Sequence, residues 1–466
     1  MDYLIDLLEV EKPKIEISFR ERIIWTFIVL GLFFVMSNIM PIDFFQEEKI
    51  QLEDVQTLTL IVPSGFIPIT SLALPSIVLT WIILLIAYGF LTLLGININF
   101  KEFKNKVYLR IVQYLLVFLI SLFGAFILGL LFLSSSAPML ISVSIQIAIC
   151  SILVMFMIEI VDKYGIGGGI WLFIIGSVLS QIFITFLNPL RLASEYAGII
   201  PNFLDATFSG NFDILLLLPI FSTVIAFIFA IGFLFLVLFR VREDSERFEE
   251  GTIKHPLEKI HIVNVSLLFT STLLRSLFFC VMLISFSIGM EIDTVNPNQL
   301  YYWISSPLTL GGLNGILIST GITKLLYPNT IIHLIFYIFT FSLLFAFFNF
   351  LFVKFWTETS FDKREKLTQV SSTIAERHKW QILRVGFSIS FLVVFIDLIG
   401  AIGTGVGILL TVGTLYLFYE RIKITYQKSN ILAGVITLIG AFIIGILGFF
   451  IFLLFQIINQ IINRLV

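Results

Sequence analysis

Long apolar runs separated by short polar segments make up most of this chain. Five runs come first, and six follow after a polar stretch. They lie at 23–40, 71–95, 111–132, 139–160 and 170–190, and then at 214–239, 263–288, 331–355, 382–402, 405–419 and 431–455. About 20 apolar residues wound as an α-helix match the hydrocarbon thickness of a bilayer. The pattern therefore predicts ten membrane spans in two groups of five, followed by an extra C-terminal span.

Composition supports this reading. Of the 466 residues, 58% are hydrophobic and 13% are charged, whereas soluble domains carry about 25% charged residues. Only helices and closed barrels satisfy every backbone group in lipid, and the runs lack the alternation of barrel strands. We expect an all-α, polytopic membrane protein.

Basic residues set the expected orientation. Most of the 29 Lys and Arg residues fall in alternate connecting segments, which are the inner ones if the N-terminus is cytoplasmic. Cytoplasmic loops retain Lys and Arg. Residues 1–22 mix acidic and basic side chains and lack a continuous apolar stretch, so we expect a retained cytoplasmic or interfacial segment and no cleaved signal peptide.

Two outer segments, 52–70 and 308–326, are mildly apolar, interrupted by Pro or Gly, and too short to cross. Broken backbone at membrane depth is tolerated where protein buries it or water fills a cavity. These segments are either re-entrant half-helices or plain outer loops.

Catalytic patterns are missing from the sequence. The four histidines are scattered, both cysteines lie inside apolar runs, and no metal, nucleophile or phosphate-loop motif occurs. We expect no enzymatic activity, no catalytic residue, no cofactor, no metal and no direct nucleic-acid partner.

A glycine-rich run at the start of the fifth span carries a family resemblance. Residues 159–170 read EIVDKYGIGGGI and resemble the signature of SecY, the channel subunit of the Sec protein translocase, in its archaeal and eukaryotic branch. Other stretches agree in order: ISFRERIIW at 17–25, KHPL at 254–257, VNV at 263–265, FWTET at 355–359 and IGAIGTGVGILLTV at 399–412.

The resemblance implies a SecY-like inverted repeat of two five-helix halves around a pore. The halves would be 23–190, with a plug-like segment at 52–70, and 191–425, leaving 426–466 for the extra helix. The implied function is a protein-conducting channel that moves unfolded secretory polypeptides across the membrane and releases apolar segments sideways into lipid.

The family's apolar pore ring carries over onto matching positions of this chain. They are Ile166 and Ile170 in the fifth span, Val265 and Leu268 in the seventh, Leu410 in the tenth and, anchored on Pro75, Ala73 and Ile77 in the second. Such a ring resists ions by excluding water. Taken singly, each of these side chains is more simply explained by core or lipid packing, and only the joint motif match assigns them to the ring.

Three polar residues inside spans have two explanations each. Asn264 matches a lateral-gate position of the family, or it makes an interhelical hydrogen bond without gating. Arg275 and Asp397 lie at similar depths, counting ~1.5 Å per residue from the inner ends. They form an intramembrane ion pair, or each faces an outer funnel separately.

The implied partners are SecE-like and beta-type small subunits, the ribosome, substrate polypeptides and membrane lipid, and the implied location is the plasma membrane. The loop at 357–381 is short for the family, and positive-inside retention alone explains its charge. Two rival functions remain open: a SecY paralogue with a restricted insertase or scaffold role, and a secondary transporter, which would need polar ligands at mid-depth.

Overall fold

A computed structural model describes residues 10–11, 13, 17–39, 70, 72–93, 103–132, 137–192, 195–210, 214–246, 263–274, 276–277, 280, 328–360, 387–397, 399, 401–402, 404–425 and 429–465. Over these residues the helices and turns that make up the chain are interrupted by one short hairpin of two strands. It divides into two compact units, one of Met1–Gln181 with Ala441–Val466 and one of Ile182–Gly440.

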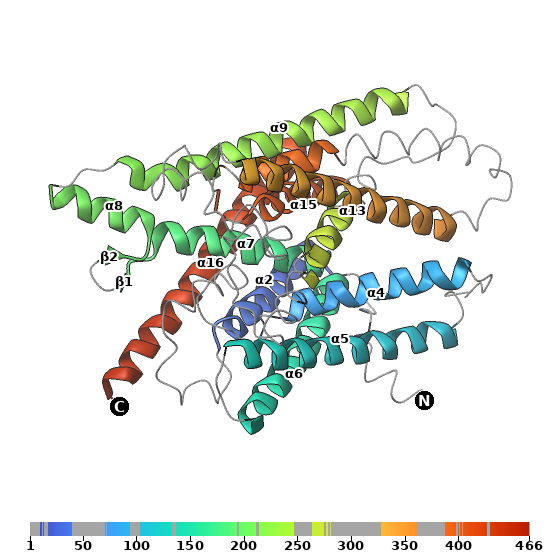
Figure 1. Ribbon diagram of the computed structural model, residues 1–466, viewed down its shortest axis with the longest axis horizontal. Helices are drawn as coiled ribbons and strands as arrows, with labels where there is room; N and C mark the ends of the chain where they lie inside the picture. The colour runs from blue at the N-terminus through green and yellow to red at the C-terminus, as the bar shows by residue number, and fades with distance from the viewer. Residues whose placement is uncertain are drawn as a thin grey trace. The chain divides into compact units, whose positions relative to one another are not determined.

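The first unit begins with α2 (Phe19–Met36), which is followed by α4 (Ala73–Leu93), α5 (Phe103–Phe132), α6 (Ala137–Tyr164) and α7 (Gly169–Leu187). Helix α2 starts four residues before the predicted span because Ser18 and Glu21 form a capping box. The Ser18 N–H donates to Glu21 Oε2 at 3.0 Å, and the Glu21 N–H donates to Ser18 Oγ at 3.4 Å. Two N–H groups at the helix start are thereby satisfied. Helices α5 and α6 pack against each other (Figure 1).

The second unit holds a feature that the sequence did not predict. Between the fifth and sixth spans lie a hairpin of β1 (Arg191–Leu192) and β2 (Glu195–Tyr196), the helix α8 (Ile199–Phe208) and the 3₁₀ turn η2 (Ile214–Leu217). Pro201 stands in the first turn of α8, where its missing N–H removes no helical hydrogen bond. The apolar signal of this stretch is too short to separate a surface helix from a loop.

The remaining helices of the second unit are α9 (Leu218–Glu246), Val263–Leu274, α13 (Pro328–Ser360), Phe387–Asp397 and α15 (Gly405–Thr425). Among the described residues of the whole chain, seven helices are long and apolar enough to cross a membrane. The apolar helices Ala73–Tyr88, Val263–Leu274 and Phe387–Asp397 are shorter over the described residues. The interrupted segments 52–70 and 308–326 lie outside those residues, apart from Thr70.

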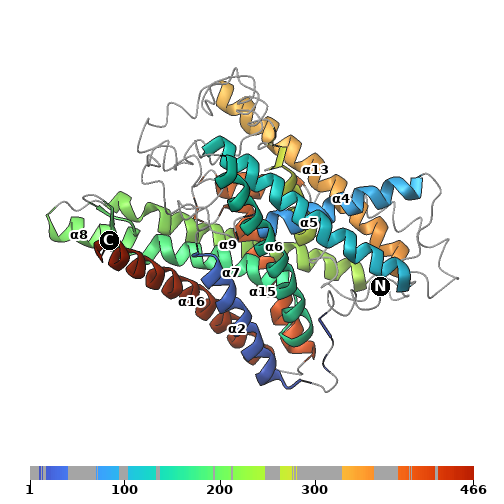
Figure 2. The same ribbon diagram turned by 90° about the horizontal axis from the view of Figure 1, so that it is seen from below.

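Helix α16 (Asn430–Leu465) confirms the extra C-terminal helix and is longer than the predicted 431–455. It runs beside α2 in the first unit (Figure 2). A Cβ atom at Gly448 would collide with the Ser180 side chain of α7 and come within 3.0 Å of the Phe34 ring of α2. The glycine therefore permits close packing of α16 on this unit.

An ion pair joins α5 to α6 in the first unit. Arg110 Nη2 contacts Glu159 Oε1, and the Tyr114 hydroxyl donates to the same oxygen at 3.1 Å. The exposed fractions of the two charged side chains are 23% and 16%. The pair therefore fixes the register of two apolar helices near the start of the glycine-rich run.

This pair should show strong energetic coupling. Replacing Arg110 alone or Glu159 alone with Leu should destabilise the protein by about 3 kcal/mol, because each change removes the opposite charge from a partly buried side chain. The Arg110→Leu/Glu159→Leu double variant should regain most of that loss. Denaturant titration in detergent, followed by helical circular dichroism, measures the differences.

The matched control is the pair Lys423–Glu420 on α15, 3.9 Å apart, whose lysine side chain is 38% exposed. Its Lys423→Leu variant should change stability by less than about 1 kcal/mol. Additive losses in the Arg110 and Glu159 double variant would contradict the coupling.

Candidate functional site

The candidate pore residues of the first unit lie on α4 and at the start of α7. Ala73 and Ile77 are separated by one helical turn on α4, and both are fully buried. Ile170 is the second residue of α7 and is also buried, whereas Ile166, in the glycine-rich connection before α7, is half-buried.

The connection before α7 is held by side chains of α2. Arg22 Nη1 donates to the Gly165 carbonyl at 3.2 Å, and the Ile166 N–H donates to Thr26 Oγ1 at 3.0 Å. Gly167 and Gly168 have φ angles of 91° and 72°, a region that side chains with a Cβ rarely adopt. The glycines of the signature thus serve a tight turn, and Ile166 is tied by its backbone to α2.

In the second unit, Val265 and Leu268 lie on the helix Val263–Leu274, and Leu410 lies on α15; all three are buried. Asn264, on the helix Val263–Leu274, is 3% exposed. Its Nδ2 donates a hydrogen bond to Thr414 Oγ1 on α15, at 3.4 Å. Leu268 and Leu410 each lie one turn from this contact on their own helix. The hydrogen bond thus places two of the candidate pore residues near a shared helix contact.

Gly413 allows this contact to form. A Cβ atom at Gly413 would collide with Oδ1 of Asn264 and lie 2.9 Å from Nδ2. The interhelical hydrogen bond expected for Asn264 is therefore present, and the glycine opposite makes room for the amide. Whether Asn264 also gates stays a prediction.

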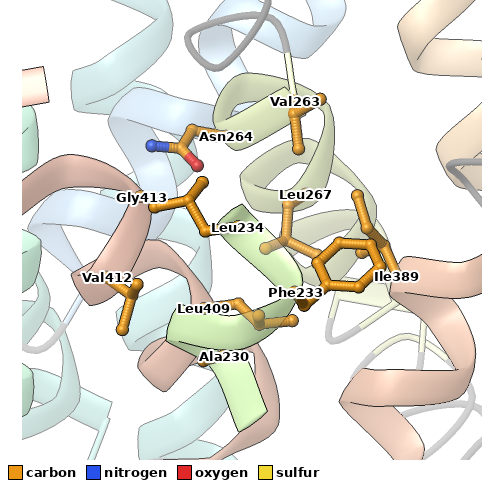
Figure 3. A pocket seen from close by; sticks show the side chains of 10 residues that line it. All are labelled: Ala230, Phe233, Leu234, Val263, Asn264, Leu267, Ile389, Leu409, Val412 and Gly413. Atoms are coloured by element: carbon orange, nitrogen blue, oxygen red, sulfur yellow. The ribbon is translucent and has the colours of Figure 1, made fainter. Parts of the chain in front are cut away.

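A pocket of about 40 Å³ opens beside this contact (Figure 3). Asn264 is its one polar side chain, and the rest of the lining is apolar. The other residues are Ala230, Phe233 and Leu234 of α9, Val263 and Leu267, Ile389 of Phe387–Asp397, and Leu409, Val412 and Gly413 of α15. The pocket marks a place where four helical segments of the second unit are loosely packed around an amide.

Asp397 is buried, and its Oδ1 accepts the Gly405 N–H at 2.5 Å. The carboxylate therefore caps the first turn of α15, a role that the depth comparison with Arg275 did not reveal. Arg275 lies outside the described residues, so its pairing with Asp397 stays a prediction. The capping role explains by itself how a buried carboxylate gains a strong hydrogen bond.

Known proteins resemble this chain over nearly its whole length. No protein-family model matches it. The SecY subunit of Methanothermobacter thermautotrophicus is 27% identical over 451 residues, which cover 89% of this chain and 93% of the relative. SecY of Methanocaldococcus jannaschii is 28% identical, over 91% of this chain and 96% of the relative. The sec61 alpha subunit of Schizosaccharomyces pombe is 23% identical, over 90% of this chain and 93% of the relative.

Solved structures give the same result for the fold. A protein-conducting channel matches with a TM-score of 0.65 at 25% identity, covering 92% of this chain and 98% of the other. Sec61 from a canine ribosome-channel complex has a TM-score of 0.65 at 24% identity. The chain is a multi-pass, all-α membrane protein with the fold of these channels, and its described residues include the C-terminal helix α16.

The close contact between Asn264 and Gly413 predicts that two glycine-to-alanine variants will differ in their free energy of unfolding. Gly413→Ala should destabilise the protein by about 1 to 3 kcal/mol, because the added methyl group displaces the buried amide. Gly232→Ala on α9 should be neutral or stabilising by about 0.5 to 1 kcal/mol, because nothing lies within 4 Å of the new Cβ and alanine favours a helix. Chemical denaturation of both variants in the same detergent makes the comparison; equal effects would contradict the close approach.

Proposed function

From its sequence similarity to SecY and from its fold, we infer that this chain is a SecY-like, protein-conducting channel subunit. The observation that carries the inference is the similarity to SecY, in sequence and in fold, across about nine-tenths of the chain. We propose that unfolded secretory polypeptides pass through the channel and that apolar segments leave it sideways into lipid. The proposal assigns no enzymatic reaction and no cofactor to the chain.

The proposed pore ring consists of the seven positions carried over from the resemblance: Ala73, Ile77, Ile166, Ile170, Val265, Leu268 and Leu410. All are apolar and none carries a group that would hold an ion. A ring of such side chains resists ion flow because a narrow apolar passage excludes water. Six of the seven are buried within their own units, and Ile166 is half-buried.

The proposed lateral gate is the seam between the second and seventh spans, and it involves Asn264 of the seventh span. The hydrogen bond from Asn264 Nδ2 to Thr414 Oγ1 is long, at 3.4 Å. The apolar pocket beside it has room for side chains to move. Breaking one interhelical hydrogen bond within a membrane costs only about 0.6 kcal/mol on average. A contact of this strength can yield when the seventh span moves.

The proposed partners are a SecE-like subunit, a beta-type subunit, the ribosome and the translocating polypeptide. The proposed location is the plasma membrane with the N-terminus in the cytoplasm, which leaves most basic residues on the inner side. The halves 23–190 and 191–425 are proposed as the two repeats, with 426–466 as an addition to them.

The pore assignment predicts an ion leak. Replacing Ile166 and Ile170 together with Gly should raise the resting conductance of the protein in planar bilayers severalfold, since the apolar constriction widens and admits water. The control is Ile24→Gly/Ile28→Gly on α2, whose side chains are exposed; it should conduct like the wild type. Equal conductance in all three folded proteins would contradict the pore assignment.

The gate assignment predicts a specific crosslink. A photoreactive residue in place of Val263, which is next to Asn264 and lines the pocket, should crosslink to the signal segment of a stalled secretory chain. The same residue in place of Phe336, on the exposed side of α13, should not. Crosslinking at Phe336 with none at Val263 would place the exit elsewhere.

A further inference from the structure

The same set of backbone contacts occurs once in each compact unit, at the start of α7 and at the start of α15. In the first unit, Thr26 Oγ1 accepts the Ile166 N–H at 3.0 Å, and Asp162 Oδ1 accepts the Gly169 N–H at 2.8 Å. Gly169, the first residue of α7, lies so close to the backbone of Ile158 that a Cβ atom would come within 2.5 Å of its carbonyl oxygen. We name this arrangement the first clamp.

The second unit repeats each contact. Thr223 Oγ1 accepts the Ile402 N–H at 2.9 Å, and Asp397 Oδ1 accepts the Gly405 N–H at 2.5 Å. Gly405, the first residue of α15, lies against the backbone of Val393. A Cβ atom at Gly405 would collide with the carbonyl oxygen of Val393. We name this arrangement the second clamp.

The agreement extends to spacing. The aspartate precedes its glycine by seven residues in the first clamp and by eight in the second. The backbone that faces the glycine is four residues before the aspartate in both, at Ile158 and at Val393. Each threonine hydroxyl also donates to the carbonyl four residues earlier in its own helix, at 2.8 Å for Thr26 and 2.7 Å for Thr223. Chance does not readily produce three matched contacts at offsets that agree to within one residue.

The chemistry of each contact is suited to holding a helix start. The first N–H groups of a helix have no partner inside the helix, and a carboxylate that accepts one forms a charge-assisted bond at the positive end of the helix dipole. The glycine is required because the group that faces it is backbone, which cannot rotate away as a side chain can. The threonine supplies a third anchor from a separate helix, α2 or α9.

We propose that the two clamps are equivalent positioning devices, in which Thr26 with Asp162 and Thr223 with Asp397 fix the first turns of α7 and α15. Through these turns they hold Ile170 and Leu410, which are assigned to the pore ring. The positional part of this proposal stands on the contacts alone, whereas the part about the pore rests on the proposed function. The clamps differ in environment: Asp162 is exposed, and Asp397 is 2% exposed.

The test compares Ala and Asn at each aspartate in the full chain in lipid vesicles. In Asp162→Ala and Asp397→Ala, the peptide that contains the first turn of α7 or α15 should exchange its amide hydrogens about tenfold faster, since a bond to a charged group is lost. The Asn variants keep an acceptor oxygen and should restore slow exchange. Asp205→Ala on α8, outside both clamps, should leave both peptides unchanged. The effect should be larger at Asp397, which is buried.

Resting conductance of the same proteins supplies the second measurement. Both Ala variants should leak ions, and both Asn variants should remain closed. If either Ala variant does not fold, Thr26→Val and Thr223→Val, which remove one hydroxyl and keep the side-chain shape, should speed exchange at Ile166 and Ile402 and raise conductance.

The outcomes separate the two parts of the proposal. Unchanged exchange in the Ala or Val variants overturns the clamps. Faster exchange without a leak, while Ile166→Gly/Ile170→Gly does leak, overturns the link between clamp and pore. If that glycine variant does not leak either, the pore assignment itself fails and the clamps remain as structural devices.

Discussion

A chain in hydrocarbon must satisfy every backbone N–H and C=O group from within itself, and the rest of this structure follows from that requirement. Inside a helix the requirement is met automatically; where one apolar helix ends and the next begins, it is not. At the starts of α7 and α15 the chain meets it with side chains: a threonine from another helix and an aspartate from the preceding one. Of the residues assigned to the pore, Ile166 and Ile170 stand at the first connection, and Leu410 lies on the helix that follows the second.

Close backbone approach is the second means by which the helices are held. Hydrophobic burial gives little drive for association between helices that already lie in lipid, so packing distance matters more. Gly448 lets α16 approach α7 and α2, and Gly413 lets α15 approach the amide of Asn264. The first contact joins an additional helix to the first unit. The second leaves one weak polar bond and a small apolar pocket between helices of the second unit.

The sequence predicts the helical class, the extra C-terminal helix and most of the span positions, because long apolar runs have few alternatives in a membrane. It does not predict α8 with its hairpin, where the apolar signal is short. It also does not identify the partners of Thr26 and Thr223. A threonine inside an apolar helix normally bonds the carbonyl four residues earlier, as both do here, and nothing local reveals that the same oxygen accepts a second bond from a distant loop. For Asp397, depth counting pointed to Arg275 and could not identify the bond to Gly405, which depends on how the glycine-rich connection folds back.

Transport of a polypeptide across a membrane is the most direct test of the account. The chain, purified with the subunits that accompany it and reconstituted into sealed vesicles, should move a secretory precursor into the lumen when ribosomes synthesise it outside. The precursor should then resist added protease until detergent opens the vesicles. A precursor that stays fully sensitive to protease, in vesicles where a related SecY complex protects it, would contradict the claim that this chain conducts proteins.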